Sequence, residues 1–361
     1  MELALEEARR GVGQTSPNPA VGAVLVQGDR VVGRGHHTWA NKKHAEIVAI
    51  EAARGEARNA TMYLTLEPCC HQGRTGPCTR ALIEAGVRRV VAAMADPNPS
   101  VRGKGFDELR SAGIEVEVDG TFAAAAVRLN EAFVHFMRTG RPLVTLKAAL
   151  TLDGKIAAPE DNRGWITSEL ARAHVQRVRH ESDSILTGIG TLLADDCLLT
   201  DRTSLPRSRP LLRIVVDSQL RIPLHSAMVE SCQSDVLVVT TSIASADRRK
   251  ALEARGVRVL VANHPNGRTD LHTIADHLAQ GKYLSLMIEA GSKVNWVALE
   301  TGVVDKILFY YAPKILGGLQ SLPVAGGPGR QRRSDAIQFR NVTLHPITAE
   351  EFAVEAWLVK D

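Results

Sequence analysis

Four side chains stand out because their types and spacing suit metal chemistry. His44 and Glu46 are separated by one residue, Cys69 follows a proline, and eight residues separate Cys69 from Cys78. One imidazole and two thiolates leave one position of a tetrahedral zinc open, which is the arrangement of a catalytic zinc. A water held there reaches a pKa near ~7. We therefore predict a catalytic zinc site from His44, Cys69 and Cys78, with Glu46 as its proton shuttle.

The segment between the two cysteines leaves the ligand set open by residue type. It contains Cys70 and His71, which are rival ligands, and it must fold back to return Cys78 to the metal. Taken singly, His44 is more typical of a surface or capping histidine and Cys69 of a buried small hydrophobe. Together with Glu46 they match the H-x-E and P-C parts of the zinc-deaminase signature. That signature usually has two residues between its cysteines, whereas this sequence has eight. The pattern favours hydrolytic deamination of a pyrimidine-like ring.

Hydrophobic periodicity predicts that helices and strands alternate along the chain, which is typical of layered α/β domains. In the first part we expect helices at Leu3–Arg10, Ala45–Ala53, Thr79–Ala85, Gly105–Ala112 and Phe122–Phe136, and strands at Val21–Val26, Val31–Gly35, Thr61–Leu66, Arg89–Ala93 and Ile114–Val118. Later strands are expected at Leu143–Ala148, Ser184–Thr187, Leu211–Asp217, Val236–Thr240, Val257–Val261, Leu284–Ile288, Lys306–Tyr311 and Phe352–Leu358, with helices at Ser168–His180, Ala246–Ala254, Leu271–Leu278 and Val294–Glu300.

Length and composition set the domain count and the class of protein. A chain of 361 residues is too long for one ordinary hydrophobic core, and Gly140 and Pro142 forbid helix continuation. We therefore expect two domains, 1–141 and 142–361. The net charge of +4 is scattered along the chain, which argues against a nucleic-acid partner. No basic, apolar leader opens the sequence and no apolar run is long enough to span a membrane, so we expect a cytoplasmic protein.

The motifs around these residues closely resemble the bifunctional deaminase–reductase family of riboflavin biosynthesis, over essentially the whole chain. The resemblance rests on Pro17-Asn18-Pro19-Ala20-Val21-Gly22, Thr65-Leu66-Glu67-Pro68-Cys69, Gly73-Arg74-Thr75, Asp96-Pro97-Asn98-Pro99, Leu152-Asp153-Gly154, Trp165-Ile166-Thr167-Ser168, Thr191-Leu192-Leu193-Ala194-Asp195-Asp196, Asp217-Ser218 and Glu289-Ala290-Gly291. It implies a cytidine-deaminase-like αβα domain followed by a dihydrofolate-reductase-like α/β domain. It also implies that Cys69 and Cys78, rather than Cys70, bind the zinc.

The resemblance further implies the two reactions and their cofactors. The first domain would deaminate 2,5-diamino-6-(5-phosphoribosylamino)pyrimidin-4(3H)-one with zinc, and the second would reduce the ribosyl group of the product to ribityl with NADPH. Residues expected to line the nicotinamide cofactor are Leu150, Trp165, Thr191, Asp195, Ser218, Gly291, Ser292, Lys293, Val294, Asn295, Trp296 and Val297. Residues expected to hold the substrate are Asn18, Asp96, Asn98, Arg163, Arg179, Leu199, Arg202 and Glu289. His71 would also line the deaminase pocket.

Several alternatives stay open from the sequence alone. Lys147, alone in an apolar strand, lies either beside the reacting sugar or with its stem along apolar surface and its ammonium in water. A deaminase of nucleic-acid bases would leave the second domain idle, and a zinc-stabilised scaffold would not need Glu46. Nothing in the residues decides between NADPH and NADH. We expect a small-molecule substrate, no membrane partner and a homo-oligomer.

Overall fold

The polypeptide divides into two compact units, each with its own sheet. The computed structural model describes residues 1–40, 42–71, 76–160 and 164–360. One unit comprises Met1–Gly140 with Pro206–Arg209, and the other comprises Arg141–Leu205 with Pro210–Asp361. Within the described residues, no helix is long and apolar enough to cross a membrane.

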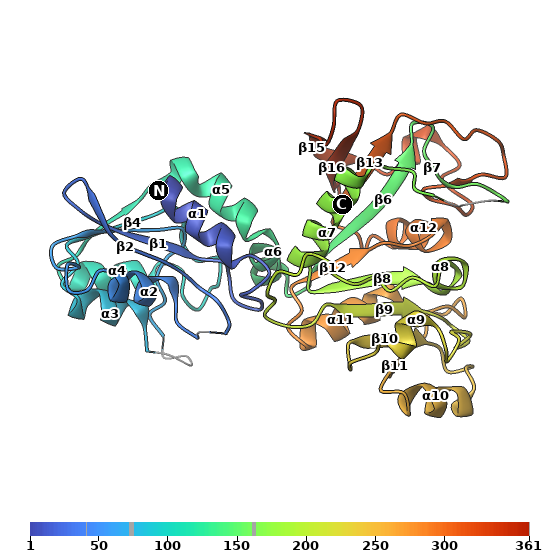
Figure 1. Ribbon diagram of the computed structural model, residues 1–361, viewed down its shortest axis with the longest axis horizontal. Helices are drawn as coiled ribbons and strands as arrows, with labels where there is room; N and C mark the ends of the chain where they lie inside the picture. Colours follow the sequence, from blue (N-terminus) through green and yellow to red (C-terminus); the bar gives the residue numbers. More distant parts are fainter. Residues whose placement is uncertain (41, 72–75, 161–163, 361) are drawn as a thin grey trace. The chain divides into compact units, whose positions relative to one another are not determined.

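The first unit is built on a five-stranded mixed sheet (Figure 1). Its spatial order is β2 (Arg30–His36), β1 (Gly22–Gln27), β3 (Thr61–Leu64), β4 (Arg89–Ala92) and β5 (Glu115–Val118). β1 pairs antiparallel with both β2 and β3, whereas β3, β4 and β5 run parallel. Parallel strands end at the same edge of a sheet, so the loops that follow β3 and β4 emerge side by side.

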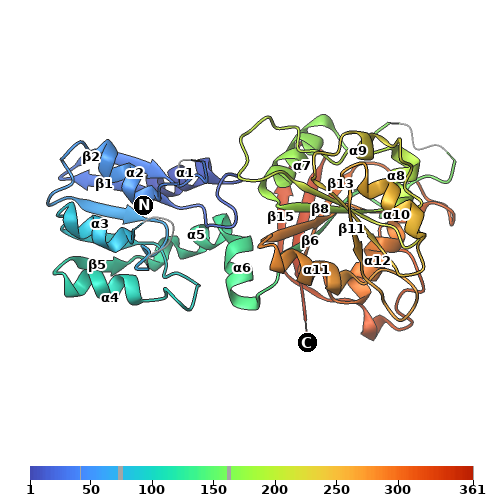
Figure 2. The same ribbon diagram turned by 90° about the horizontal axis from the view of Figure 1, so that it is seen from below.

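Helices cover both faces of this sheet (Figures 1 and 2). One face carries α1 (Glu2–Gly11) and α5 (Ala123–Leu129), and the other carries α2 (Ala45–Ala52), α3 (Cys78–Glu84) and α4 (Lys104–Ser111). The main core of the unit lies under the second group, where Ala49, Leu82 and Leu109 pack on Leu25 and Leu64. The αβα layering that we expected for the first domain is confirmed.

Helix α2 lies so close to β2 that no side chain fits between their backbones. A Cβ on Gly35 would lie 2.4 Å from the carbonyl oxygen of Ala45 and 2.6 Å from the amide nitrogen of Ala49. Ala45 and Ala49 are themselves fully buried on the facing side of the helix. Small residues on both elements therefore fix the depth at which the first turn of α2 rests on the sheet.

The single helix expected over Phe122–Phe136 is wrong, because the chain forms a short 3-10 turn η1 (Gly120–Phe122), α5, and then α6 (Glu131–Thr139). The break falls at Asn130, whose backbone leaves the helical region. Its buried side chain accepts a hydrogen bond from the Ala20 amide at 2.7 Å and donates one to the Ala20 carbonyl at 2.9 Å. This pairing with a distant backbone outweighs continuation of the helix.

The second unit contains a nine-stranded sheet with helices on both faces (Figure 2). Its order is β11 (Arg258–Val261), β10 (Val236–Thr240), β9 (Leu212–Val216), β8 (Ser184–Gly188), β12 (Ser285–Ile288), β6 (Leu143–Thr151), β13 (Lys306–Ala312), β16 (Phe352–Leu358) and β15 (Phe339–Pro346). The pairs from β11 to β13 are parallel, and β16 and β15 continue the sheet antiparallel. β7 (Lys155–Ala157) and β14 (Leu322–Pro323) form a separate ribbon.

Two hydrophobic clusters assign the helices of this unit to opposite faces. One face packs under α11 (Leu271–Gln280) and α12 (Ser292–Glu300). The other packs under α7 (Glu169–Glu181), α8 (Ile189–Asp195), α9 (Ala227–Glu230) and α10 (Ala246–Glu253). The sequence interpretation had not separated α8, α9, β7, β14, β15 or the 3-10 turn η2 (Arg333–Asp335) as elements of their own.

We predict that Gly35→Ala destabilises the first unit by about 1–3 kcal/mol, because the added methyl group collides with backbone atoms of α2 that cannot rotate away. The measurement is the denaturant midpoint of unfolding. Gly120→Ala is the matched control, since a Cβ there meets nothing within 4 Å. An unchanged midpoint for Gly35→Ala would contradict the close contact of β2 with α2.

Candidate functional sites

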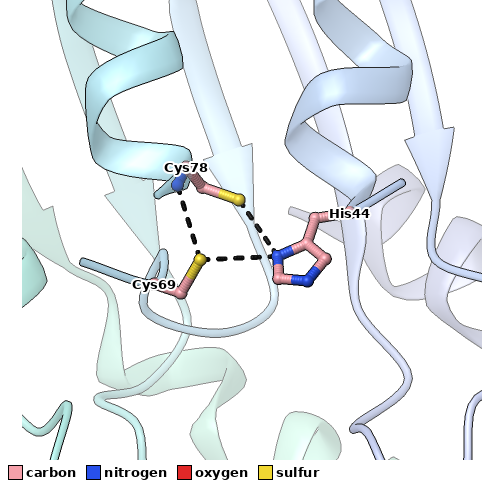
Figure 3. Close-up of side chains that lie close together, drawn as sticks. All are labelled: His44, Cys69 and Cys78. Carbon is pink, nitrogen blue, oxygen red and sulfur yellow. Dashed lines mark hydrogen bonds between the residues drawn. The ribbon is translucent and has the colours of Figure 1, made fainter. Parts of the chain in front are cut away.

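Three expected ligands converge in the first unit. His44 is the N-cap residue of α2, Cys69 lies in the loop after β3, and Cys78 is the first residue of α3. The Nδ1 of His44 lies 3.1 Å from Sγ of Cys78 and 3.4 Å from Sγ of Cys69, and all three ligand atoms lie within 4.8 Å of one another. Figure 3 shows the three side chains pointing toward a common centre. Ligands held at about 2.0–2.3 Å from one zinc ion must approach this closely, so the donor set fits zinc.

The charges around the cluster favour a thiolate. The pKa of Cys69 falls to about 4, first because the Cys78 thiol donates a hydrogen bond to it and then because His44 does so against the cost of burial. The backbone amide of Cys78 also points at Sγ of Cys69, 3.4 Å away. The same contacts raise the pKa of His44, led by its hydrogen bond to Cys69. The hydrogen bond to Cys69 and burial raise the pKa of Cys78.

Glu46 lies buried in the first turn of α2, next to this cluster. Only 3% of its surface is exposed. Burial raises its pKa, with a further rise from the nearby charge of Cys69. A carboxyl group whose pKa moves toward neutral pH is suited to accept a proton and release it again, which an exposed glutamate does poorly.

The rival ligands differ in where they lie. Cys70 is outside the group of metal-ligating atoms found among the described residues. Burial raises the pKa of its thiol, so the anion that a metal prefers is disfavoured there. His71 is exposed, and its charge acts on Asp96.

A hydrogen-bonded chain orients Asn18 beside the cluster. The Nδ1 of His37 lies 2.7 Å from the carbonyl oxygen of Lys43, and its Nε2 lies 3.0 Å from Nδ2 of Asn18. Burial lowers the pKa of His37, so the ring is neutral and its Nε2 accepts the hydrogen of the amide. The rings of His37 and His44 meet edge to face at 5.3 Å. Asn18 therefore keeps its carbonyl oxygen available as an acceptor, and His37 is a residue that the sequence interpretation missed.

Asp96 and Asn98 lie together in the loop after β4. The Oδ1 of Asp96 accepts a hydrogen bond from the Asn98 amide at 2.8 Å. Asp96 is 8% exposed, and burial, with the nearby charge of Glu67, raises its pKa to about 6. The charge of Cys69 also acts on Asp96, which places this loop within electrostatic reach of the metal ligands.

A buried trio of charges occupies the second unit. The Oε1 of Glu289, just after β12, accepts from Lys147 of β6 at 2.9 Å, and its Oε2 accepts from Arg179 of α7 at 2.9 Å. Burial alone would raise the pKa of Glu289, but the two cations lower it to about 2. The sequence left open that the Lys147 ammonium lies in water. Lys147 is only 7% exposed, which contradicts that alternative. Arg179 also donates to the Thr200 carbonyl at 3.1 Å.

The expected cofactor run begins at the N-terminus of α12, with Gly291 as its N-cap. A Cβ on Gly291 would lie 3.3 Å from Oγ1 of Thr191, so these two positions are neighbours as the sequence analysis grouped them. Two buried polar atoms of the helix, Oδ1 of Asn295 and Nε1 of Trp296, have no hydrogen-bond partner within the described chain. Buried polar atoms nearly always have a partner, so these two atoms are candidates for contact with a bound ligand or a water.

The chain itself covers part of this run. Ser292 donates to the Pro323 carbonyl at 2.5 Å, and Asn295 donates to the Val324 carbonyl at 2.8 Å. The guanidinium of Arg330 stacks 5.8 Å from the centre of the Trp296 ring. Of the rest of the run, Lys293 is exposed, while Val294 and Val297 pack on the core.

The remaining expected residues are spread more widely. Leu150 is fully buried in β6, Trp165 is 69% exposed and stacks on Arg172, Asp195 ends α8, and Ser218 accepts from Thr241 at 2.8 Å. Leu199 is buried with a positive φ of 51°, and the Arg202 amide donates to Gln176 at 2.9 Å. No hydrogen bond between described residues joins Trp165 or Ser218 to Gly291 or Glu289. Arg163 lies outside the described residues.

Comparison with known proteins finds a match for each of the two expected domains. Residues 1–94 match the cytidine and deoxycytidylate deaminase zinc-binding region, and residues 142–350 match the RibD C-terminal domain. The riboflavin biosynthesis protein RibD of Actinobacillus pleuropneumoniae is 40% identical, covering 94% of this chain and 90% of the relative. That of Escherichia coli is also 40% identical, covering 94% of each chain.

Solved structures agree along the whole chain. Acinetobacter baumannii RibD superposes with a TM-score of 0.88 at 34% identity, covering 99% of this chain and 98% of the other. The Thermotoga maritima diaminohydroxyphosphoribosylaminopyrimidine deaminase/5-amino-6-(5-phosphoribosylamino)uracil reductase superposes with a TM-score of 0.84 at 32% identity, covering 99% and 97%. Fold and matches together define a zinc-dependent deaminase joined to an NADPH-dependent reductase. The chain belongs to the RibD family of riboflavin biosynthesis, which confirms the resemblance.

We predict that Cys78→Ser abolishes zinc binding whereas Cys70→Ser retains one zinc per chain. Serine is a poor zinc ligand at neutral pH, and only Cys78 belongs to the cluster with His44 and Cys69. Elemental analysis of purified protein measures the zinc. Loss of zinc in Cys70→Ser with full retention in Cys78→Ser would exchange their assigned roles.

Proposed function

We propose that residues 1–141 deaminate 2,5-diamino-6-(5-phosphoribosylamino)pyrimidin-4(3H)-one and that residues 142–361 reduce the ribosyl side chain of the product to ribityl. The name of the Thermotoga maritima relative pairs these two reactions and supports the assignment. The observation that carries the deaminase half is the meeting of His44, Cys69 and Cys78 beside a buried Glu46.

In the deaminase, His44, Cys69 and Cys78 hold the zinc and Glu46 moves the proton. Zinc, when bound, lowers the pKa of a coordinated water to about 7. The carboxylate of Glu46 takes a proton from the attacking water and passes it to the departing amine. The ring carbon gains an oxygen and loses its amino group as ammonia. The raised pKa of Glu46 suits both halves of this transfer.

Asn18, Asp96 and Asn98 recognise the ring in this proposal. Because His37 accepts the amide hydrogen of Asn18, the free oxygen of that amide accepts from a ring N–H or an amino group. Asp96 is a further acceptor once it is ionised, above a pH of about 6. A row of acceptors selects a ring edge that carries donors, as a diaminopyrimidine does.

In the reductase, the charge trio positions the phosphoribosyl substrate. NADPH, when bound, supplies the hydride. Glu289 fixes the ammonium of Lys147 and the guanidinium of Arg179 at defined places, where the first lies beside the sugar and the second binds the phosphate together with Arg163 and Arg202. Leu199 packs against the same substrate.

The cofactor in this proposal lies along Leu150, Trp165, Thr191, Asp195, Ser218 and the run from Gly291 to Val297. The amides at the start of α12 face its pyrophosphate, because a helix N-terminus attracts anions. The unpartnered Asn295 and Trp296 atoms support a polar ligand at this helix.

We further propose a cytoplasmic homo-oligomer whose only substrates are small molecules. A reducing compartment keeps the thiols of Cys69 and Cys78 available to the metal. The mass of the protein in solution tests the oligomer, and ammonia release from transfer RNA tests the exclusion of nucleic acid.

We predict that Glu46→Gln lowers kcat for ammonia release by about 10²–10⁴-fold while one zinc per chain remains bound, because the amide cannot accept the proton. The measurement is ammonia release from the diaminopyrimidine, alongside zinc content. Glu51→Gln is the matched control, since that carboxylate lies on the same helix and pairs with Lys43 at the surface. Full turnover by Glu46→Gln would rule out the assigned proton path.

We predict that Glu289→Gln lowers kcat/KM for NADPH oxidation with the deaminated intermediate by about 30-fold or more, since two buried cations lose their charge partner. Ammonia release by the same variant should be unchanged, which reports on the integrity of the chain. Glu300→Gln, an exposed position on α12, is the control. Wild-type NADPH oxidation by Glu289→Gln would refute the role of the trio.

A further inference from the structure

We propose that Glu67 is a positioning residue of the deaminase, whose carboxylate holds the loop of Asp96 and Asn98 in place beside the zinc ligands. This inference rests on the proposed function, in which those two residues recognise the ring. Glu67 lies between the end of β3 and Cys69, and only 3% of its surface is exposed. Its own amide donates to the Met94 carbonyl at 3.0 Å, which ties the ends of β3 and β4 together.

The carboxylate of Glu67 accepts hydrogen bonds from four backbone amides, two in the loop after β4 and two in the first turn of α4. Its Oε2 accepts from Asp96 at 3.0 Å and from Gly103 at 2.9 Å. Its Oε1 accepts from Gly105 at 3.0 Å and from Phe106 at 3.4 Å. Both oxygens are therefore occupied, and the donors span both ends of the segment 96–106.

No lysine, arginine or histidine forms an ion pair with Glu67 among the described residues. The negative charge is instead balanced by peptide dipoles, two of them from the first turn of α4. A buried carboxylate with only backbone donors acts as a template for the backbone around it. If the loop moves one of these amides away, the buried carboxylate loses a hydrogen bond. That loss raises the free energy of the folded state.

The start of α4 also contacts the segment that carries Cys69 directly. A Cβ on Gly105 would lie 2.2 Å from the carbonyl oxygen of Pro68 and 3.2 Å from Oε1 of Glu67. Pro68 is the residue before Cys69. The start of α4 is thus seated against the peptide that delivers a metal ligand, with room for glycine only.

The hydrogen bonds of Glu67 also fix the two residues that are proposed to recognise the ring, Asp96 and Asn98. The Asp96 amide is held by Glu67, and Oδ1 of Asp96 accepts from the Asn98 amide at 2.8 Å. The Oδ1 of Asn98 in turn accepts from Ser100 at 3.0 Å. Each side chain fixes the next peptide, so a displaced Asp96 amide displaces Asn98 as well.

The test is Glu67→Gln, because glutamine keeps the shape but places an NH₂ group against two amide donors. We expect KM for the diaminopyrimidine to rise by about 10- to 100-fold with little change in kcat, since the chemistry at Glu46 is untouched. One zinc per chain should remain, and NADPH oxidation with the deaminated intermediate should be unchanged. Glu67→Asp keeps the charge but is too short to reach all four amides, so it should raise KM equally.

Other outcomes overturn the proposal. An unchanged KM removes the positioning role, and a loss of zinc that accompanies the rise in KM assigns Glu67 to support of the ligands instead. If Glu67→Gln does not fold, Gly105→Ala tests the same contact from the side of α4. A raised KM with zinc retained supports the proposal, and an unchanged KM contradicts it. Asp96→Asn separates the two hypotheses. If Asp96→Asn leaves KM unchanged, the proposed recognition of the ring by Asp96 is wrong. If Asp96→Asn raises KM and Glu67→Gln does not, Asp96 recognises the ring but Glu67 does not position it.

Discussion

The candidate zinc cluster of His44, Cys69 and Cys78 depends on how closely helix α2 packs against strand β2. Ala45 and Ala49 of α2 face Gly35 of β2 with no side chain between the backbones. His44 caps this helix and Glu46 lies in its first turn, so the depth of packing decides how far imidazole and carboxylate reach. The packed core beneath α2 and α3 therefore sets the positions of these polar groups, and the buried residues that α2 contributes to it are the small Ala45 and Ala49.

The two glutamates with proposed roles in the chemistry are both buried, yet their pKa values shift in opposite directions. Burial raises the pKa of Glu46, the charge of Cys69 raises it further, and the nearby His44 offsets only part of this rise. Around Glu289 burial is outweighed by Lys147 and Arg179, and its pKa falls to about 2. The first carboxyl group is thereby poised to exchange a proton, and the second is a permanent anion that fixes two cations. Neither assignment follows from the residue type, because the neighbours decide it.

Few residue types bind zinc, so the sequence restricts which residues can assemble as ligands. His44, Cys69 and Cys78 could be selected from residue types and family resemblance, and the structure brings them within 4.8 Å. Strands composed mainly of apolar residues were also predictable, and Val236–Thr240 and Phe352–Leu358 have the expected bounds. The edge strand β15 was missed because its side chains are mostly exposed and carry no burial pattern. The helix break at Asn130 was missed because its cause, a pair of hydrogen bonds to Ala20, lies 110 positions away.

That last miss belongs to a wider class of polar residues that a single sequence cannot interpret. Asp183 accepts from the Leu284 amide at 2.6 Å, and Asp305 accepts from the Val144 amide at 2.8 Å, each joining backbone segments far apart in the chain. Such acids resemble catalytic groups in composition and burial, yet each accepts from a distant backbone amide, and Asp305 also pairs with Lys360 at 2.7 Å. Glu67 lies in a recognisable motif beside a metal ligand and was given no role, because the sequence shows the acid and not its four donors. Whether a buried carboxylate positions the backbone or transfers a proton depends on its partner, which is an amide, a cation or a titratable group.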